Sequence, residues 1–351
     1  MEKYERNSEK ETLFLGIDLH MRTWYVTGLL ENTEIFSKGI PGTLWDMKLL
    51  LRRYKDYRIK AVYEAGYFGY WLYDELTANG VECIVTPPSL VPQEYGNRVK
   101  TDRRDSRKLA YLLSKGLLKK IYVLAEEERY HRQVVRRRHQ LIRDRVRQQN
   151  RIKSELRLYG IDTPEIRGKW SKAYIHNLWS IRFGDDWMQE SFHLLLKTYE
   201  FLDNAVYEQT MRLKRLSQTD KYRELVEILM SVPGIGIITA MEFLLELNNM
   251  ERFSRAEQIA AYVGLTPSQY SSGDKVRMGH ITKIGKPHLR AALIEASWQL
   301  ISKDERMGKT YKRIALRAGG KRAVVGVARR LVLCLRRMLL DSSAYSFKRV
   351  A

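Results

Sequence analysis

Short apolar runs separated by turn residues dominate the first third of the chain. Runs rich in β-forming residues cover residues 13–19, 23–30, 35–40, 59–63 and 81–85, and each is bounded by polar or turn-forming residues. Helical spacing of apolar residues predicts helices over residues 44–54, 68–78 and 101–114. Three leading strands followed by alternating helices and strands predict a mixed α/β sheet domain over residues 12–124.

The pattern changes near residue 125, where a long basic helix is predicted. Residues 129–157 contain eleven Lys or Arg residues, two acids, and neither Gly nor Pro. Val135, Ile142 and Leu156 recur on a seven-residue step, with Gln149 in the remaining position. The pattern predicts a partner helix along this seam and phosphate contacts on the other faces. A solvated helix that only links two domains is the alternative.

Apolar helical sequence continues to about residue 229 after a loop at 159–169 that contains Pro164, so residues 125–225 form a predicted helical coiled-coil region. The C-terminal domain, 226–345, is predicted to be mostly helical. Its segment SVPGIGIITA places Pro-Gly-x-Gly between two apolar helical runs. This resembles a helix-hairpin-helix turn, whose glycines let backbone N–H groups approach a phosphate, but a plain helix-breaking turn fits it as well.

The charge balance narrows the class of partner. The formal net charge of +21 over 351 residues calls for a polyanion, and nucleic acid is the commonest one. An anionic membrane surface is the alternative, but neither end carries a basic amphipathic helix. No apolar run approaches the roughly 20 residues of a membrane span, and the polar N-terminus is unlike a signal peptide. Cys83 and Cys334 lie apart in apolar contexts, as reduced cysteines of a cytoplasmic protein do.

Four carboxylates are the candidate chemistry. Asp18 and Glu64 end two apolar strands, and adjacent strand ends can bring two acids together. Asp102 and Asp105 lie three residues apart at the start of a predicted helix, on the face that Leu109 continues. Acids on a packed face are costly unless a cation compensates their charge. The alternative is that Thr101 or Asp102 caps this helix and Asp105 compensates its dipole.

Four converging carboxylates suit Mg²⁺ or Mn²⁺, which prefer oxygen ligands and leave positions for phosphate. Two metal ions could activate an attacking oxygen and stabilise a leaving one. The set contains neither His nor Cys, which argues against zinc. His20 follows the first acid but belongs to no metal motif, and we interpret it as an ordinary polar residue.

The motifs, taken in order, resemble those of the transposases of insertion-sequence family 110, including its 1111 subgroup. The N-terminal half carries GIDLH, AVYEAG and VKTDRRDSRKLAYLL, which resemble the DEDD pattern of that family. The C-terminal half carries SVPGIGIITA, a long segment from AAYVGLTPSQYSSGDK to HLRAALIEAS, and KRAVVGVARRLVL. The resemblance implies a RuvC-like, ribonuclease-H-type N-terminal domain and a helical C-terminal transposase domain.

The resemblance also implies roles for single residues. Asp18, Glu64, Asp102 and Asp105 would bind the metal, and Ser272 in YSSGDK would be the nucleophile, with Ser271 as its rival. A serine that attacks a phosphodiester leaves a covalent phosphoserine link and conserves the bond for rejoining. The implied partners are donor and target double-stranded DNA, a non-coding guide (bridge) RNA of the element, and further copies of the chain in a dimer or tetramer.

Two other functions fit parts of the sequence. A RuvC-type nuclease or junction resolvase, in which water attacks without a covalent intermediate, needs only the first domain. A non-enzymatic nucleic-acid-binding regulator needs only the basic helix and the hairpin-like turn. The sequence leaves the target sequence, the guide RNA, the number of metal ions and the role of residues 1–11 open.

Overall fold

The computed structural model describes residues 10–93, 101–162, 170–272 and 275–346. Pro164 and Gly273 lie outside the described residues, as do residues 1–9 at the N-terminus. The chain forms two compact units, Met1–Leu124 and Ala125–Ala351. The finer division of the second unit at residue 225 stays a prediction.

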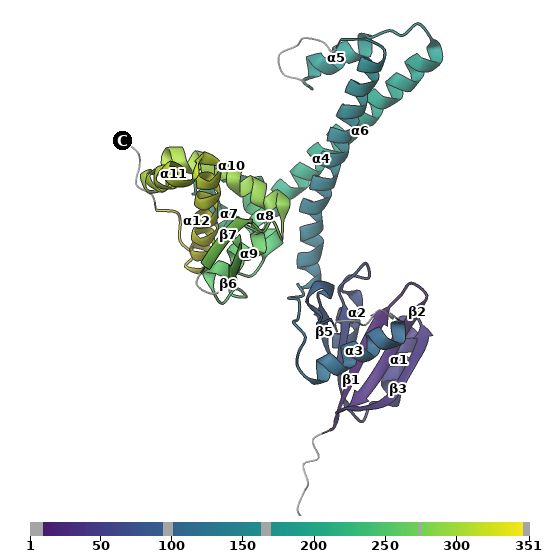
Figure 1. Ribbon diagram of the computed structural model, residues 1–351. Helices are drawn as coiled ribbons and strands as arrows, with labels where there is room; N and C mark the ends of the chain where they lie inside the picture. The colour runs from purple at the N-terminus through teal and green to yellow at the C-terminus, as the bar shows by residue number, and fades with distance from the viewer. Residues whose placement is uncertain (1–9, 94–100, 163–169, 273–274, 347–351) are drawn as a thin grey trace, which may run out of the picture. The chain divides into compact units, whose positions relative to one another are not determined.

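A five-stranded sheet forms the centre of the first unit (Figure 1). Its strands are β1 (Thr12–Leu19), β2 (Thr23–Leu30), β3 (Thr33–Pro41), β4 (Arg58–Glu64) and β5 (Glu82–Thr86). The strand order is β3-β2-β1-β4-β5, in which β1 pairs antiparallel with β2 and parallel with β4. The predicted mixed α/β sheet is therefore confirmed.

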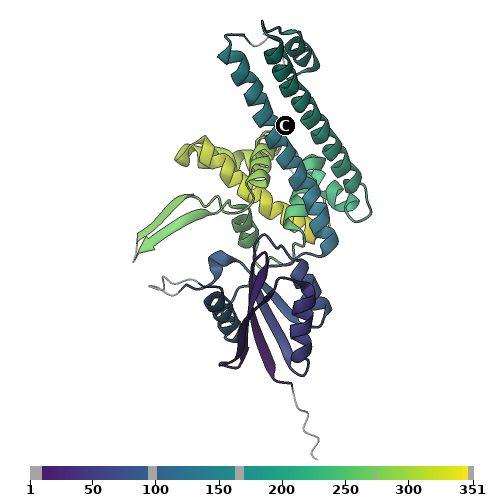
Figure 2. The same ribbon diagram turned by 90° about the vertical axis from the view of Figure 1, so that its right-hand side faces the viewer.

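Helices cover both faces of this sheet (Figures 1 and 2). They are α1 (Leu44–Arg53), α2 (Trp71–Ala78) and α3 (Asp102–Ser114), with a short 3-10 helix, η1, at Pro88–Leu90. Leu13, Leu15 and Ile17 of β1 belong to the apolar core that includes residues of α1 and α2. Leu109 and Leu112 of α3 pack with Val62 of β4 on the other face. The alternation of strand side chains between the faces produces these two layers.

The second unit is mostly helical, as predicted. Its helices are α4 (Glu126–Leu158), α5 (Lys172–Ser180), α6 (Asp186–Ser217), α7 (Arg223–Met230), α8 (Ile237–Leu247), α9 (Ala256–Val263), α10 (Pro287–Lys303), α11 (Glu305–Ala318) and α12 (Gly320–Leu340). One feature was not predicted, a two-stranded antiparallel hairpin of β6 (Pro267–Ser272) and β7 (Lys275–Ile281). None of the described helices is both long enough and apolar enough to cross a membrane.

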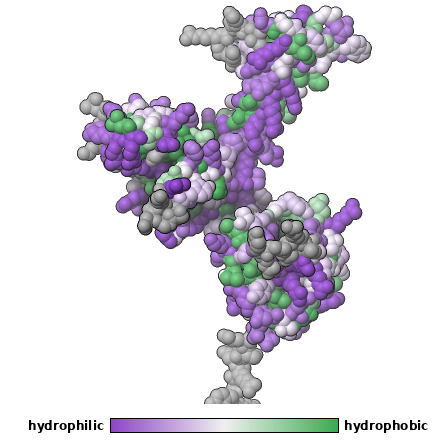
Figure 3. Space-filling model, viewed as in Figure 1, coloured by the Kyte–Doolittle hydropathy of each residue, from purple (hydrophilic) through white to green (hydrophobic). Residues whose placement is uncertain are grey.

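Helix α4 pairs with α6 of the same chain. Its buried residues are Val135, Gln148, Ile152 and Leu156, whereas Ile142 is only half-buried. Of the four predicted seam positions, Val135 and Leu156 are buried and Ile142 and Gln149 are half-buried, and a partner helix is present. Near the end of α4 the buried positions follow a four-residue step instead. Gln148, not Gln149, is buried, and its amide donates to the Leu195 carbonyl at 2.9 Å. The outward surface of α4 is strongly hydrophilic (Figure 3).

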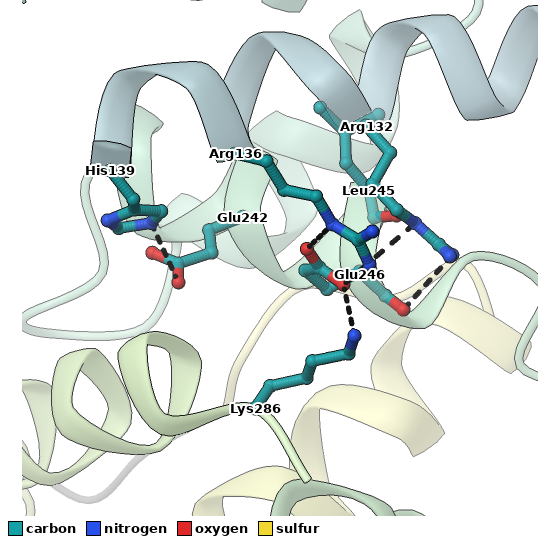
Figure 4. Close-up of polar contacts among 7 residues, drawn as sticks. All are labelled: Arg132, Arg136, His139, Glu242, Leu245, Glu246 and Lys286. Atoms are coloured by element: carbon teal, nitrogen blue, oxygen red, sulfur yellow. Dashed lines mark hydrogen bonds and ion pairs between the residues drawn. The ribbon is translucent and has the colours of Figure 1, made fainter. Parts of the chain in front are cut away.

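A buried ionic cluster fixes α4 to α8 and to the start of α10 (Figure 4). Glu246 of α8 is 6% exposed and accepts from Nε and Nη2 of Arg136 at 2.8 and 2.9 Å. Lys286 Nζ lies 3.3 Å from the same carboxylate, and Arg132 Nε donates to the Leu245 carbonyl at 2.7 Å. Buried acids are tolerated where several cations surround them. Part of the basic charge of α4 therefore holds the unit together.

Candidate functional site

Gly16 lets helix α3 lie directly on strand β1. A Cβ at this position would stand 2.0 Å from the Ser106 carbonyl oxygen and 2.4 Å from the Ala110 nitrogen, both backbone atoms of α3. Ser106 is buried, and its hydroxyl lies 2.8 Å from that of Thr27 on β2. Asp18 is two residues beyond Gly16, so it shares the face that α3 covers. This contact brings the first turn of α3 to the end of β1.

Asp18, His20 and Asp102 form a compact group at that end. One ligand atom from each residue lies within 4.8 Å of the other two. His20 Nε2 is 3.2 Å from Asp18 Oδ2 and 3.4 Å from Asp102 Oδ1. The side chain of Asp18 is 23% exposed and that of Asp102 is 57% exposed, so the group opens to solvent. His20, interpreted from the sequence as an ordinary polar residue, is exposed, and the turn after β1 brings its ring next to both acids.

The pKa of Asp18 lies above its ordinary value. Burial is the main cause, and the neighbouring charges of Asp102 and Asp105 raise the pKa further. The charge of His20 and its hydrogen bond to the carboxylate act in the opposite direction. An acid that its surroundings disfavour as an anion gains most from a bound cation.

Glu64 and Asp105 flank this group. Residue pairs Gly16–Val62 and Ile17–Tyr63 align β1 with β4, so Glu64 follows at the level of Asp18 and at the same sheet edge. Asp105 is half-buried, one helical turn after Asp102. Among the described residues, the compact group of ligand atoms includes neither Glu64 nor Asp105.

Thr101, one of the two cap residues that the capping alternative names, is the N-cap of α3. The hydroxyl of Thr101 accepts from the Arg104 backbone N–H at 3.3 Å and is the cap. Both acids lie in the first turn, where the helix dipole favours negative charge, but Asp102 also faces Asp18 and His20. The donor set of carboxylates fits a hard divalent cation such as Mg²⁺ or Mn²⁺.

Ser271 and Ser272 lie in the second unit, at the end of β6. The backbone pairs Ser271 with Val276 and Ser272 with Lys275 across the hairpin. Tyr270 is 74% exposed, and Figure 2 shows the hairpin projecting from the helices of its unit. These serines therefore occupy the end of a strand.

The cations near these serines differ in what they contact. Lys286 binds Glu246, and Arg290 Nη1 donates to the carbonyls of Val263 and Lys283 at 3.0 and 3.2 Å. Both cations thus have contacts within the protein. Arg277 and Lys283 are exposed.

The Pro-Gly-x-Gly segment forms the turn between α7 and α8. Gly234 has a φ of +91°, and a Cβ there would lie 2.7 Å from the Ala296 carbonyl oxygen of α10. This glycine therefore permits close packing of α10. Gly236 is the N-cap of α8 and has open space around it.

Comparison with known proteins matches both halves of the chain to one family. A DEDD transposase model of IS110 matches residues 15–161, and a model described as transposase IS116/IS110/IS902 family matches residues 226–312. Together the two models cover about two thirds of the chain.

Individual relatives agree with these models. A putative transposase of Sinorhizobium fredii is 30% identical over 67% of this chain, a match that spans 57% of the relative's own length. The transposase of insertion sequence IS1533 from Leptospira borgpetersenii is 26% identical over 93% of this chain and 95% of its own. The transposase of insertion sequence IS1111A from Coxiella burnetii is 23% identical over 93% of this chain and 89% of its own length.

Proposed function

Since the chain belongs to the IS110 family of transposases, we propose that it cuts and rejoins donor and target DNA through a serine nucleophile assisted by a divalent metal. The observation that carries this proposal is the convergence of Asp18 and Asp102 at the end of β1, in the part of the chain that the DEDD model matches. A mixed sheet with parallel β1, β4 and β5 is compatible with a RuvC-like, ribonuclease-H-type domain.

The metal would be held by Asp18, Glu64, Asp102 and Asp105. A divalent cation bound by these acids supplies charge that stabilises the phosphodiester during attack and the oxygen that leaves. His20 acts as a positioning residue, because its ring contacts Asp18 and Asp102 together. The partly buried Asp18 is supported by the packing of Gly16 against α3.

Ser272 supplies the attacking oxygen. Its hydroxyl oxygen forms a bond to phosphorus, the bond to the sugar oxygen breaks, and the serine proton ends on that oxygen as a free hydroxyl group. The strand remains linked to the protein as a phosphoserine ester, which a second strand's hydroxyl can attack to rejoin DNA. Ser271 is the neighbouring candidate.

The test is covalent capture. Full-length protein is incubated with Mg²⁺ and a nicked DNA substrate that prevents rejoining, and protein-linked DNA is measured on a denaturing gel. We expect the adduct with the natural chain, its loss in Ser272→Ala and its retention in Ser271→Ala. Protein-linked DNA that persists in both single variants and in the double variant contradicts a nucleophile at Ser271 or Ser272. Free ends without an adduct indicate the hydrolytic alternative.

The metal-binding role of the acids needs a separate experiment. Asp102→Asn is expected to abolish strand cleavage and to leave DNA binding intact, because the change removes a metal ligand and one negative charge. His20→Ala is expected to raise the Mn²⁺ concentration for half-maximal cleavage by about 10- to 100-fold. Cleavage that survives Asp102→Asn contradicts the metal role of Asp102. Binding without any strand cleavage by the natural chain in Mg²⁺ favours a regulator that only binds nucleic acid.

A guide RNA and a dimer or tetramer complete the proposal. The net charge of +21 supports an RNA partner recognised by shape and charge, with base pairing supplying sequence specificity. RNA that copurifies with the chain and matches the DNA beside its gene tests the guide. Light scattering of the RNA-bound protein tests the assembly. RNA-independent strand exchange contradicts the guide role.

A further inference from the structure

A strongly basic pocket lies in the first unit, away from the acids. It has a volume of about 720 Å³ and is formed where β1 and β4 begin and α1 and α2 end. Asp18 and Glu64 stand at the opposite, carboxyl ends of β1 and β4. Asp18 comes six positions after Thr12, so the pocket is about 20 Å from the acids along β1.

Five cationic side chains line this pocket: Lys10, Lys48, Arg52, Lys55 and Arg58. No carboxylate is among the described lining residues. Glu75 pairs with Lys48 at 3.2 Å and Glu82 with Arg58 at 3.0 Å, whereas no acid within the described part of the chain pairs with Arg52 or Lys55. A surplus of positive charge therefore remains.

Compensation of the helix dipole explains only part of this charge. Arg52 lies in the last turn of α1, where a cation is favourable. Lys10 and Arg58 come from outside any helix, and Lys48 lies one turn earlier. Lys48, Arg52 and Lys55 follow a four- and three-residue step, which places them on one side of α1 and its end.

The floor of the pocket is apolar, whereas its rim carries the cationic side chains. Leu51, Tyr57, Ile59 and Val81 contribute apolar surface. A duplex presents mainly phosphates and sugars, whereas an unpaired nucleotide presents both a phosphate and the face of a base. A pocket of this size accepts more than a phosphate group.

We propose that this pocket binds an unpaired stretch of nucleic acid, with phosphates on Arg52 and Lys55 and a base against the apolar floor. The inference does not depend on the proposed cleavage chemistry, because the pocket contains none of its residues. The shared chemistry is a phosphodiester with its base, and either an RNA or a DNA strand can provide it.

The test measures binding of labelled 12-nucleotide RNA and DNA strands, and of duplex DNA, by full-length protein in EDTA. The pocket variant is Arg52→Glu with Lys55→Glu, and the matched control is Lys119→Glu with Lys120→Glu, which alters net charge equally on exposed residues outside the pocket. We expect the pocket variant to weaken single-strand binding at least 10-fold and to lower the salt slope by about 1.4. The control should lose less than threefold, and duplex binding should be retained in both.

Equal loss in pocket variant and control, or equal loss for duplex and single strands, overturns the proposal. The RNA and DNA arms identify which strand is preferred. A photo-crosslink with 5-iodouracil strands on the natural chain avoids any effect of substitution on folding. Crosslinked peptides should include residues 48–59, and crosslinks found only elsewhere contradict the proposal. Since all binding is measured without metal, failure here leaves the cleavage mechanism untouched.

Discussion

Gly16 sets the distance between α3 and β1 and with it the approach of Asp102 to Asp18. Backbone atoms of α3 occupy the space of the missing side chain, so no rotamer change can make room. The hydroxyl of Ser106, which lies 2.8 Å from that of Thr27, fixes the same stretch of α3 laterally. One position without a side chain therefore determines whether two acids from distant segments can share a cation.

Gly16→Ala is predicted to separate α3 from the strand. We expect the free energy of unfolding to fall by about 1–3 kcal/mol, as overpacking generally costs, and Mn²⁺ binding to weaken. Chemical denaturation and metal titration measure the two effects. Gly66→Ala is the control, because nothing lies within 4 Å of its added Cβ, and it should change stability by less than about 0.5 kcal/mol. Normal metal binding in Gly16→Ala contradicts this account.

At the scale of elements, helix α4 has two kinds of contact. Its C-terminal half packs on α5 and α6 through Ile152 and Leu156, and its N-terminal half joins α8 through Arg132 and Arg136, so one helix serves two interfaces. Ile152 is fully buried among aromatic residues of α5 and α6, whereas Ile142 is half-buried. The seven-residue pattern in the sequence places Ile142, and not Ile152, on the buried seam.

Ile152→Ala is predicted to lower the free energy of unfolding by about 2–5 kcal/mol, because it leaves a cavity in a closed core. Ile142→Ala, the matched control with the same change in side chain, should cost about 1 kcal/mol, since solvent already reaches part of its side chain. Denaturation of the two variants side by side distinguishes the observed packing from the heptad seam. Equal losses support the heptad.

The ion pairs of Glu246 stabilise the packing of α8 in a pH-dependent way. Burial by itself raises its pKa, but hydrogen bonds from Arg136 and the charges of Lys286, Arg136 and Arg132 outweigh burial and hold the pKa below its ordinary value. The ionised Glu246 therefore stabilises the fold fully above its ordinary pKa of 4.5. This stabilisation is lost as the pH falls through the lower pKa that Glu246 has in the folded protein.

Glu246→Gln is predicted to lower the free energy of unfolding by about 2–3 kcal/mol at pH 7, since three cations lose their buried partner. The difference from the natural chain should shrink as the pH falls below the ordinary pKa. Glu208→Gln removes an exposed ion pair with Arg212 and should cost less than about 0.5 kcal/mol. Thermal melts between pH 3 and 7 measure these changes, and a difference that does not vary with pH argues against stabilisation by the ion pairs.

At the scale of the whole molecule, the charge of +21 must be divided between structure and binding. Arg132, Arg136 and Lys286 serve the buried cluster, whereas Arg52 and Lys55 remain unpaired by acids among the described residues. Net charge alone therefore overestimates the number of cations that can contact phosphate.

Binding to nucleic acid is predicted to be strongly salt-dependent. Contact with six or more phosphates lowers the affinity by at least about 1,000-fold between 50 and 200 mM salt. Fluorescence anisotropy in EDTA gives the slope of log affinity against log salt without cleavage. A slope shallower than about 2 means that few of the surplus cations contact phosphate.

Local pattern determined most of the fold by itself. Alternating strands and amphipathic helices up to residue 124, the long basic helix and the helical C-terminal half all follow from periodicity, because side-chain spacing decides which face is buried. The motifs around Asp18, Glu64 and Asp102 likewise indicate the family without any coordinates.

Tertiary structure alone decided which residues meet. His20 joins Asp18 and Asp102 because Gly16 admits α3, a contact between segments more than 80 residues apart. Gln148 and Ile152, rather than Ile142, are buried because α6 fixes the packing of α4. Glu242 and Glu246 are acids within an apolar run, and their partners come from other elements: His139 and Arg136 of α4, and Lys286 at the start of α10. Distances across the fold depend on packing between elements, which no local spacing encodes.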